Sequence, residues 1–293
     1  MSSTSKSQAL AIAALLLGNA ALAFGPWLVR LSEVGPAAAG FWRLALAIPF
    51  LVLVGAVAGQ PLRWPGRALG ITIAIAAIFF AADLAAWHAG IGLTRLANAT
   101  LFGNISAFAF AAWGLWLARS WPTPLQAAAL ILAAGGTVLL MVGSAELSAE
   151  HLHGDLLALL AGLFYTGYLI GIERVRGTLQ PLPVLTLASA FGAPLLLVLA
   201  LLTGEQIVPS NWTPVLVLAL SSQVLGQGLL VYSLGVFPPL VVGLATLTQP
   251  AISGVIGWLA YGETLTPLDF AGAVAIGLAL MLVRLRPGSA QAT

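Results

Sequence analysis

Long apolar runs separated by short polar connections are the main pattern in this sequence. The runs are rich in Leu and Ala and show no period-two alternation, which favours helices over strands. Each run has about 20 residues, the length at which a helix crosses the hydrocarbon core of a bilayer. We therefore predict ten membrane-spanning helices, at about residues 8–29, 36–58, 67–91, 96–118, 124–143, 154–173, 182–203, 213–235, 238–260 and 267–285.

Two stretches of the chain carry the same landmarks in the same order. Each opens with Ala-Thr-Leu, reaches Trp-Leu-Ala, breaks, and restarts at Thr-Pro-Leu. The landmarks are Ala99-Thr100-Leu101, Trp116-Leu117-Ala118 and Thr123-Pro124-Leu125 in the first stretch, and Ala245-Thr246-Leu247, Trp258-Leu259-Ala260 and Thr266-Pro267-Leu268 in the second. Upstream, Gly18 and Arg30 stand at a matching distance from Gly162 and Arg174. The shared order indicates an internal duplication.

The duplication divides the ten spans into two sets of five. We expect a first five-helix repeat at residues 1–143, a connecting outer loop at 144–153 and a second repeat at 154–293. Because five is an odd number, the second repeat enters the membrane the other way up. The expected fold is an all-α membrane protein of ten transmembrane helices, arranged as two inverted five-helix repeats.

Composition supports the membrane assignment and removes several classes of function. The chain is 60% hydrophobic with 7% charged residues, too apolar for a water-soluble domain of 293 residues. It has no cysteine, and Lys6 is its only lysine. A P-loop, a Schiff-base cofactor and a thiolate metal site are therefore excluded. Basic patches typical of nucleic-acid binding are absent, and the three histidines suggest no metal site.

The basic residues give the expected orientation, since they concentrate on the cytoplasmic side of membrane proteins. With both termini in the cytoplasm, eight basic residues lie inside and three outside. The inner set is Lys6, Arg63, Arg67, Arg119, Arg174, Arg176, Arg284 and Arg286, and the outer set is Arg30, Arg43 and Arg95. Most acidic residues fall outside: Glu33, Glu146, Glu150, Asp155, Glu205, Glu263 and Asp269. The first span resembles a signal peptide, but we expect it to be retained because cleavage would delete half of a repeated element.

Several polar side chains fall inside the spans, where exposure to lipid is costly. Those near mid-depth are Asn19, Asn104, Tyr165, Gln223 and Gln249, and we include Gln227 with them. Hydrogen bonds between helices would explain any one of them. Together they predict a polar cavity at the centre of the bundle, with these residues as candidates for substrate binding.

Asp83 is the most informative charge, because it lies inside the third span at a depth similar to that of Arg43 in the second. We predict that the two form an ion pair. The pair could be structural, Asp83 could carry a proton, or Asp83 and Arg43 could meet the ammonium and carboxylate of a substrate. Aromatic and imidazole side chains surround the acid, and we add them to the candidate binding residues: Phe79, Phe80, Trp87 and His88. Such a lining suits a flat apolar substrate or an organic cation.

On these residues the chain resembles the drug/metabolite transporter superfamily, in its ten-helix branch with two EamA-type repeats. The second repeat carries the pattern through Ala245-Thr246-Leu247, Pro250, Gly262-Glu263, Leu265, Gly272 and Gly277, and Phe41-Trp42-Arg43-Leu44 resembles the start of the family's second helix. The first repeat departs from it, since Asn104 stands where Pro250 would map and Trp121-Pro122 replaces Gly-Glu. The chain is most similar to YddG-type exporters of aromatic amino acids. The resemblance implies export across a bacterial inner membrane by alternating access around a central cavity.

We therefore expect a monomeric exporter of small amphipathic metabolites, most of all aromatic and other neutral amino acids, with no cofactor. Two buried charges suit a zwitterion and disfavour phosphorylated sugars, which need several buried cations. The alternative is efflux of flat organic cations bound by Asp83 and the aromatic rings. An intramembrane enzyme would need a nucleophile with a base, and the only candidates, Asp83 and His88, are poorly placed on one helix face. We expect no enzymatic activity.

Overall fold

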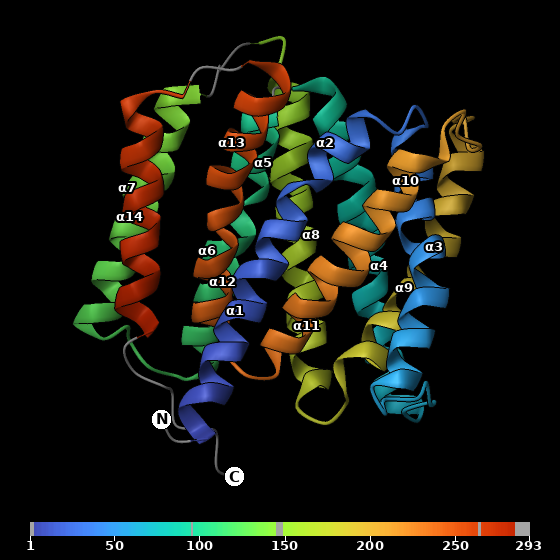
Figure 1. Cartoon of the computed structure of the whole chain (residues 1–293), viewed down its shortest axis with the longest axis horizontal. Helices are drawn as coiled ribbons and strands as arrows, with labels where there is room; N and C mark the ends of the chain where they lie inside the picture. The colour runs from blue at the N-terminus through green and yellow to red at the C-terminus, as the bar shows by residue number, and fades with distance from the viewer. Residues whose placement is uncertain (1–2, 95, 145–148, 263–264, 285–293) are drawn as a thin grey trace.

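The protein is an all-helical bundle, described by a computed structural model for residues 3–94, 96–144, 149–262 and 265–284 (Figure 1). The helices of the first half are α1 (Ser3–Ala23), α2 (Gly25–Arg30), α3 (Pro36–Val57), α4 (Arg67–Leu93), α5 (Leu96–Gly103), α6 (Ile105–Leu117) and α7 (Pro124–Ser144). Those of the second half are α8 (Leu152–Arg176), α9 (Pro181–Leu202), α10 (Trp212–Leu218), the π-helix η1 (Ala219–Gln227), α11 (Gly228–Leu234), α12 (Pro239–Thr246), α13 (Thr248–Tyr261) and α14 (Pro267–Arg284).

Within the described residues the helices form ten membrane-crossing rods, so the expected fold class is confirmed. In chain order the rods are α1 with α2, α3, α4, α5 with α6, α7, α8, α9, α10 with η1 and α11, α12 with α13, and α14. Eight stretches are long and apolar enough to cross a membrane. The other two rods, α7 and α14, contribute the shorter apolar segments Pro124–Leu140 and Pro267–Val283. The rods agree with the predicted spans to within a few residues, because apolar length and polar connections define both.

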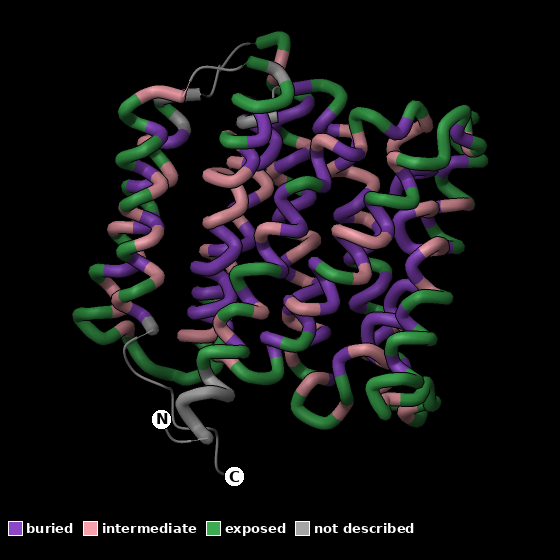
Figure 2. Tube along the Cα trace, in the orientation of Figure 1, coloured by how far each residue is buried: buried purple, intermediate pink, exposed green. Residues whose placement is uncertain are grey.

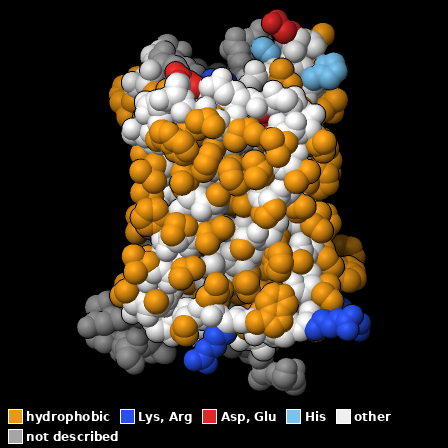
Figure 3. Space-filling view, turned by 90° about the vertical axis from the view of Figure 1, so that its right-hand side faces the viewer, with side chains coloured by type: hydrophobic (Ala, Val, Ile, Leu, Met, Phe, Trp, Pro, Cys, Tyr) orange, Lys and Arg blue, Asp and Glu red, His pale blue; other side chains and the backbone are white. Residues whose placement is uncertain are grey.

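The middle of the bundle surface is apolar and its two edges are charged. Figure 3 shows hydrophobic side chains over the central band of one face, with Lys and Arg prominent at the lower edge and Asp, Glu and His at the upper edge. The described ends of α1 and α14 both lie on the lower side of Figure 1. This is a multi-pass membrane protein. Six charged residues used in the orientation argument fall among the positions or side chains that the structure does not describe: Lys6, Arg95, Glu146, Glu263, Arg284 and Arg286.

Three rods are broken, and the eighth is widened by the π-helix η1. The breaks follow Ala23 in the first rod, lie at Asn104 in the fourth and lie at Leu247 in the ninth. Pro26 and Pro250 stand in the first turn after two of these breaks, a position where the missing proline N–H removes no helical hydrogen bond. By contrast, Pro49 and Pro194 lie inside the continuous helices α3 and α9.

The landmarks repeated in the sequence perform the same structural task twice. Thr123 exchanges reciprocal hydrogen bonds with Gln126 at the start of α7, and Thr266 does so with Asp269 at the start of α14. Each pair is a capping box, which satisfies backbone donors at a helix N-terminus. Thr-Pro-Leu is therefore the N-terminal signature of the last helix in each half.

The contacts between the two halves also come in matched pairs. α3 packs against α9, α6 against α12, and α7 against α14. The contact of α4 with α8 has its counterpart in the contact of η1 and α11 with α1. Figure 2 shows that burial concentrates where these rods meet, while the outer faces of α7 and α14 are exposed. This is the arrangement that an inverted duplication would produce, and we propose it as the organisation of the chain.

Candidate functional site

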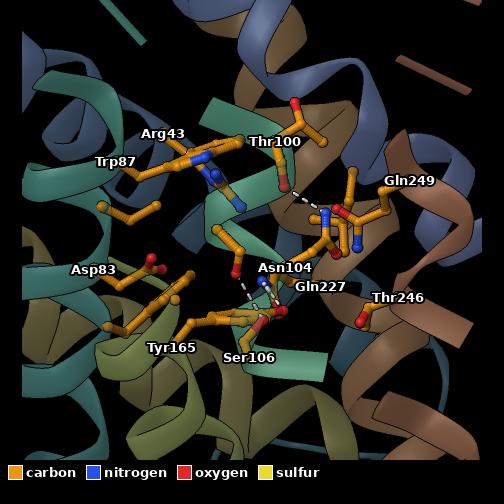
Figure 4. Close-up of a pocket in the computed structure, with 15 residues that line it drawn as sticks. Arg43, Asp83, Trp87, Thr100, Asn104, Ser106, Tyr165, Gln227, Thr246 and Gln249 are labelled. Atoms are coloured by element: carbon orange, nitrogen blue, oxygen red, sulfur yellow. Dashed lines mark hydrogen bonds between the residues drawn. The ribbon is translucent and has the colours of Figure 1, made fainter. Parts of the chain in front are cut away.

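A cavity lies where the broken rods meet (Figure 4). Its lining comes from both halves of the chain: Leu22, Arg43, Phe80, Asp83, Leu84, Trp87, Thr100, Gly103, Asn104, Ser106, Gly162, Tyr165, Gln227, Thr246 and Gln249. Its volume is about 70 Å³. This is the space open to the centres of water-sized groups, and one buried water needs about 10–15 Å³ of it. The cavity therefore has room for about five such groups.

The helix breaks supply part of the polar lining. Thr100, Gly103, Asn104 and Ser106 come from the two sides of the break between α5 and α6. The amide of Asn104 donates to the carbonyl of Thr100 over 2.5 Å, and the hydroxyl of Ser106 donates to that of Gly103 over 3.0 Å. Such side-chain bonds compete with the backbone hydrogen bonds of the helix. They stabilise the interruption although this segment contains no proline. On the opposite wall, Thr246 and Gln249 flank the break between α12 and α13.

Close packing of α5 against α8 places the break beside Tyr165. A Cβ atom on Gly162 would lie 2.5 Å from the carbonyl oxygen of Gly103, so no larger residue fits there without a shift. Tyr165 follows Gly162 by three residues on α8 and therefore shares its face. Its hydroxyl accepts a hydrogen bond of 3.1 Å from the amide of Gln227.

The π-helix η1 brings two glutamines inward. Gln227 accepts from the hydroxyl of Tyr168 over 3.5 Å in addition to its bond with Tyr165, and it lines the cavity. Gln223 lies behind the cavity wall, fully buried. It accepts from Nε of Arg43 over 3.1 Å and donates to the hydroxyl of Ser189 over 3.1 Å. Segments of π-helix are often found at functional sites.

The expected ion pair between Arg43 and Asp83 does not form in the described structure, where Arg43 donates from Nε to the neutral Gln223. Both side chains line the cavity and are nearly inaccessible, Arg43 being 3% and Asp83 8% exposed. The guanidinium carbon of Arg43 lies 5.8 Å from the ring centroid of Phe80. Among the described residues, the Asp83 carboxyl group has no hydrogen-bond partner, so an arginine and an acidic side chain face one cavity without forming a pair.

The eleven residues predicted to bind substrate divide into two groups. Seven of them line the cavity: Phe80, Asp83, Trp87, Asn104, Tyr165, Gln227 and Gln249. Four lie elsewhere: Asn19, Phe79, His88 and Gln223. The amide of Gln249 donates to Asn19 over 2.8 Å, which joins α13 to α1, and His88 Nδ1 lies 3.0 Å from the carbonyl oxygen of Pro36. Phe79 is 38% exposed and meets Phe164 on the outside of α4 and α8. That the lining residues bind substrate stays a prediction.

Seven lining residues were not among the sequence candidates: Leu22, Leu84, Thr100, Gly103, Ser106, Gly162 and Thr246. The sequence does hold a signal for three of them. Thr100 and Thr246 are the same residue of the repeated Ala-Thr-Leu landmark, and Gly162 is the partner of Gly18 in the duplication. Equivalent positions of an inverted repeat meet the central cavity from opposite sides, which would have selected both threonines.

Comparison with known proteins supports the interpretation of the second half. Residues 152–285 match the EamA-like transporter family. The match indicates a membrane transporter of small solutes. A protein of known crystal structure is similar to 94% of this chain over 96% of its own length, with a TM-score of 0.75 and 16% sequence identity. At that identity the likeness shows the fold. No curated protein matches the sequence.

Proposed function

We propose that this protein exports small amphipathic metabolites, most of all aromatic and other neutral amino acids, across a bacterial inner membrane. The observation that carries the proposal is the central cavity, which is lined by an aromatic wall and by two unpaired charges of opposite sign. Its place at the helix breaks is typical of carriers that expose one site alternately to each side. YddG-type exporters of aromatic amino acids are the transporters that we propose as its functional relatives.

The volume of the cavity is consistent with an amino acid headgroup. Room for about five water-sized groups accommodates the ammonium, α-carbon and carboxylate that all α-amino acids share. A larger side chain requires the surrounding helices to part, and the interruptions at Asn104 and Leu247 are where rods can bend. We propose a monomer with both termini in the cytoplasm, since the lower edge that holds the described ends is also the basic edge.

Efflux of organic cations is the second candidate, favoured by the aromatic residues around Asp83. Phe80, Trp87 and Tyr165 line the same cavity as the unpaired carboxylate. Aromatic faces and a carboxylate together bind flat cations. The positive charge of Arg43 in that cavity opposes such a ligand, which is why we place the amino acids first.

Flux into proteoliposomes separates the two candidates. The purified protein is reconstituted into proteoliposomes. Labelled tryptophan, threonine and methyl viologen are then added outside in separate experiments, with and without a pH gradient. The amino acid proposal predicts flux of tryptophan and threonine well above that of protein-free vesicles, and little flux of methyl viologen. Flux of methyl viologen alone would favour the cation carrier, and no flux of any of the three would reject both.

A further inference from the structure

We infer that Arg43 and Asp83 form a two-point site for a zwitterion, with the guanidinium binding its carboxylate and the carboxylate of Asp83 binding its ammonium. The inference rests on the proposed transport function and names the groups that select the substrate. The two side chains come from the adjacent helices α3 and α4 and point into the cavity from the same side (Figure 4). They interact electrostatically but do not form an ion pair.

The bonding of Arg43 leaves its outer edge free for a ligand. Its Nε atom donates to Gln223, and within the described structure its two Nη groups have no hydrogen-bond partner. Gln223 is itself fixed by its bond to Ser189 on α9, so the guanidinium is held from behind. Because glutamine is neutral, the bond orients the arginine without cancelling its charge. A guanidinium edge with two free amino groups matches the two oxygens of a carboxylate.

Asp83 supplies the complementary anion. Its side chain is more than nine-tenths buried, lines the cavity, and accepts no hydrogen bond from any described residue. A buried charge without a hydrogen-bonded partner costs free energy, and the same holds for Arg43. A zwitterion placed between them satisfies both charges in one step. An amine would satisfy only Asp83, and an acid only Arg43.

The rest of the lining assigns the substrate side chain to an apolar wall. Phe80, Leu84 and Trp87 lie on α4 beside Asp83. Tyr165 has its hydroxyl engaged by Gln227, so it offers the cavity mainly its ring. The site therefore takes neutral α-amino acids with apolar or aromatic side chains.

Matched ligands test the two points separately. Equilibrium binding of labelled phenylalanine to the purified full chain is competed with phenethylamine, which lacks the carboxylate, and with 3-phenylpropanoate, which lacks the ammonium. Each lost charge-assisted contact should weaken binding by about 10- to 100-fold. In Arg43→Gln, phenylalanine should bind no better than phenethylamine, and in Asp83→Asn no better than 3-phenylpropanoate. Arg63→Gln and Glu150→Gln, loop residues that do not line the cavity, should keep the preference of the unchanged protein.

Gln223→Glu tests the orienting role of Gln223 with a change of nearly identical shape. A carboxylate at this position pairs with Arg43 and removes its free charge. Phenylalanine and 3-phenylpropanoate should therefore bind about 10-fold more weakly, while phenethylamine is unaffected. A merely structural loss would weaken all three ligands alike and would contradict the role.

The outcomes distinguish this inference from the proposed function. If the unchanged protein transports phenylalanine and both Arg43→Gln and Asp83→Asn keep its ligand preferences, the two-point site is wrong and the transport function stands. If the unchanged protein neither binds nor transports any of the three ligands, both fall. If Arg43→Gln does not fold, Arg43→Lys replaces it, because lysine lacks the paired Nη groups. An unchanged preference for phenylalanine over phenethylamine in that variant would also overturn the inference.

Discussion

At the scale of single residues, Arg119 is the clearest case of a residue whose conformation its own sequence disfavours. It follows α6 with a φ of 48°, in the left-handed region. Gly262 follows α13 with a φ of 66°. Arg119 is the second residue after α6 and Gly262 the first after α13, so in each half a left-handed residue follows the end of this helix. The first repeat thus keeps a left-handed residue near this helix end without the glycine that favours it.

We predict that Arg119→Gly stabilises the fold. A residue with a side chain costs about 1–2 kcal/mol in the left-handed region, and glycine removes this strain. Part of the gain is lost because glycine has more conformational freedom in the unfolded chain. The free energy of unfolding in detergent should rise by about 0.5–1 kcal/mol. Arg63→Gly serves as the control, because Arg63 also lies in a loop but does not have a positive φ. A lower stability for Arg119→Gly than for the unchanged protein would contradict the assignment of strain.

At the scale of elements, the breaks and the π-helix explain why polar groups gather at one depth. In a continuous helix the backbone N–H and C=O groups bond to one another, so only its side chains are available to a cavity. The interruptions at Asn104 and Leu247 bring residues on both sides of each break to the cavity wall, and η1 contributes Gln227. All four irregular rods contribute lining residues, beside the continuous helices α3, α4 and α8. By contrast, α7 and α14 are continuous, contribute no described lining residue and pack against each other.

The pairing of α7 with α14 depends on two glycines that lie back to back. A Cβ on Gly136 would lie 2.8 Å from the carbonyl oxygen of Gly272, and one on Gly272 would lie 2.7 Å from that of Gly136. Gly136→Ala should therefore lower the free energy of unfolding by about 1–3 kcal/mol, since the helices must separate. A Cβ on the neighbouring Gly135 would meet open space, so Gly135→Ala should be neutral or slightly stabilising. Equal melting temperatures for the two variants in detergent would refute the close contact.

At the scale of the whole molecule, the arrangement predicts which connections share a side of the membrane. The absence of cysteine makes the chain a ready background for accessibility labelling. Single cysteines at Ser120 and Thr178 should react with an impermeant thiol reagent from the cytoplasmic side. A cysteine at the exposed Ser210 should react from the opposite side. Labelling of Ser120→Cys and Ser210→Cys from the same side would contradict the ten-helix topology.

Much of this architecture follows from the sequence, and the rest depends on how the helices rotate and bend. Apolar length is a property of each segment alone, so the ten spans and the order of landmarks could be predicted. Depth could also be predicted, and Arg43 and Asp83, which were placed at a similar depth, line the same cavity. Depth does not determine the direction in which a side chain points around the helix axis. Gln223 therefore took the bond of Arg43 that was expected for Asp83.

The same limit explains the residues that were assigned to the cavity and lie outside it. Phe79 and Phe80 are neighbours on α4, and a step of about 100° around the helix sends one outward and the other into the core. The π-helix leaves hydropathy unchanged, so no apolar pattern indicates it. Thr100 and Thr246 are weakly polar, and only their equivalence in the duplication marks them.

The central claim is that one cavity at the helix breaks opens in turn to the two sides of the membrane. Ser106→Cys places a thiol in the cavity lining of an otherwise cysteine-free chain. An impermeant thiol reagent is added to right-side-out and to inverted vesicles, with and without phenylalanine. The account predicts labelling from both sides, slowed in each case by phenylalanine. Labelling from neither side, or from both sides at rates that phenylalanine does not change, would contradict it.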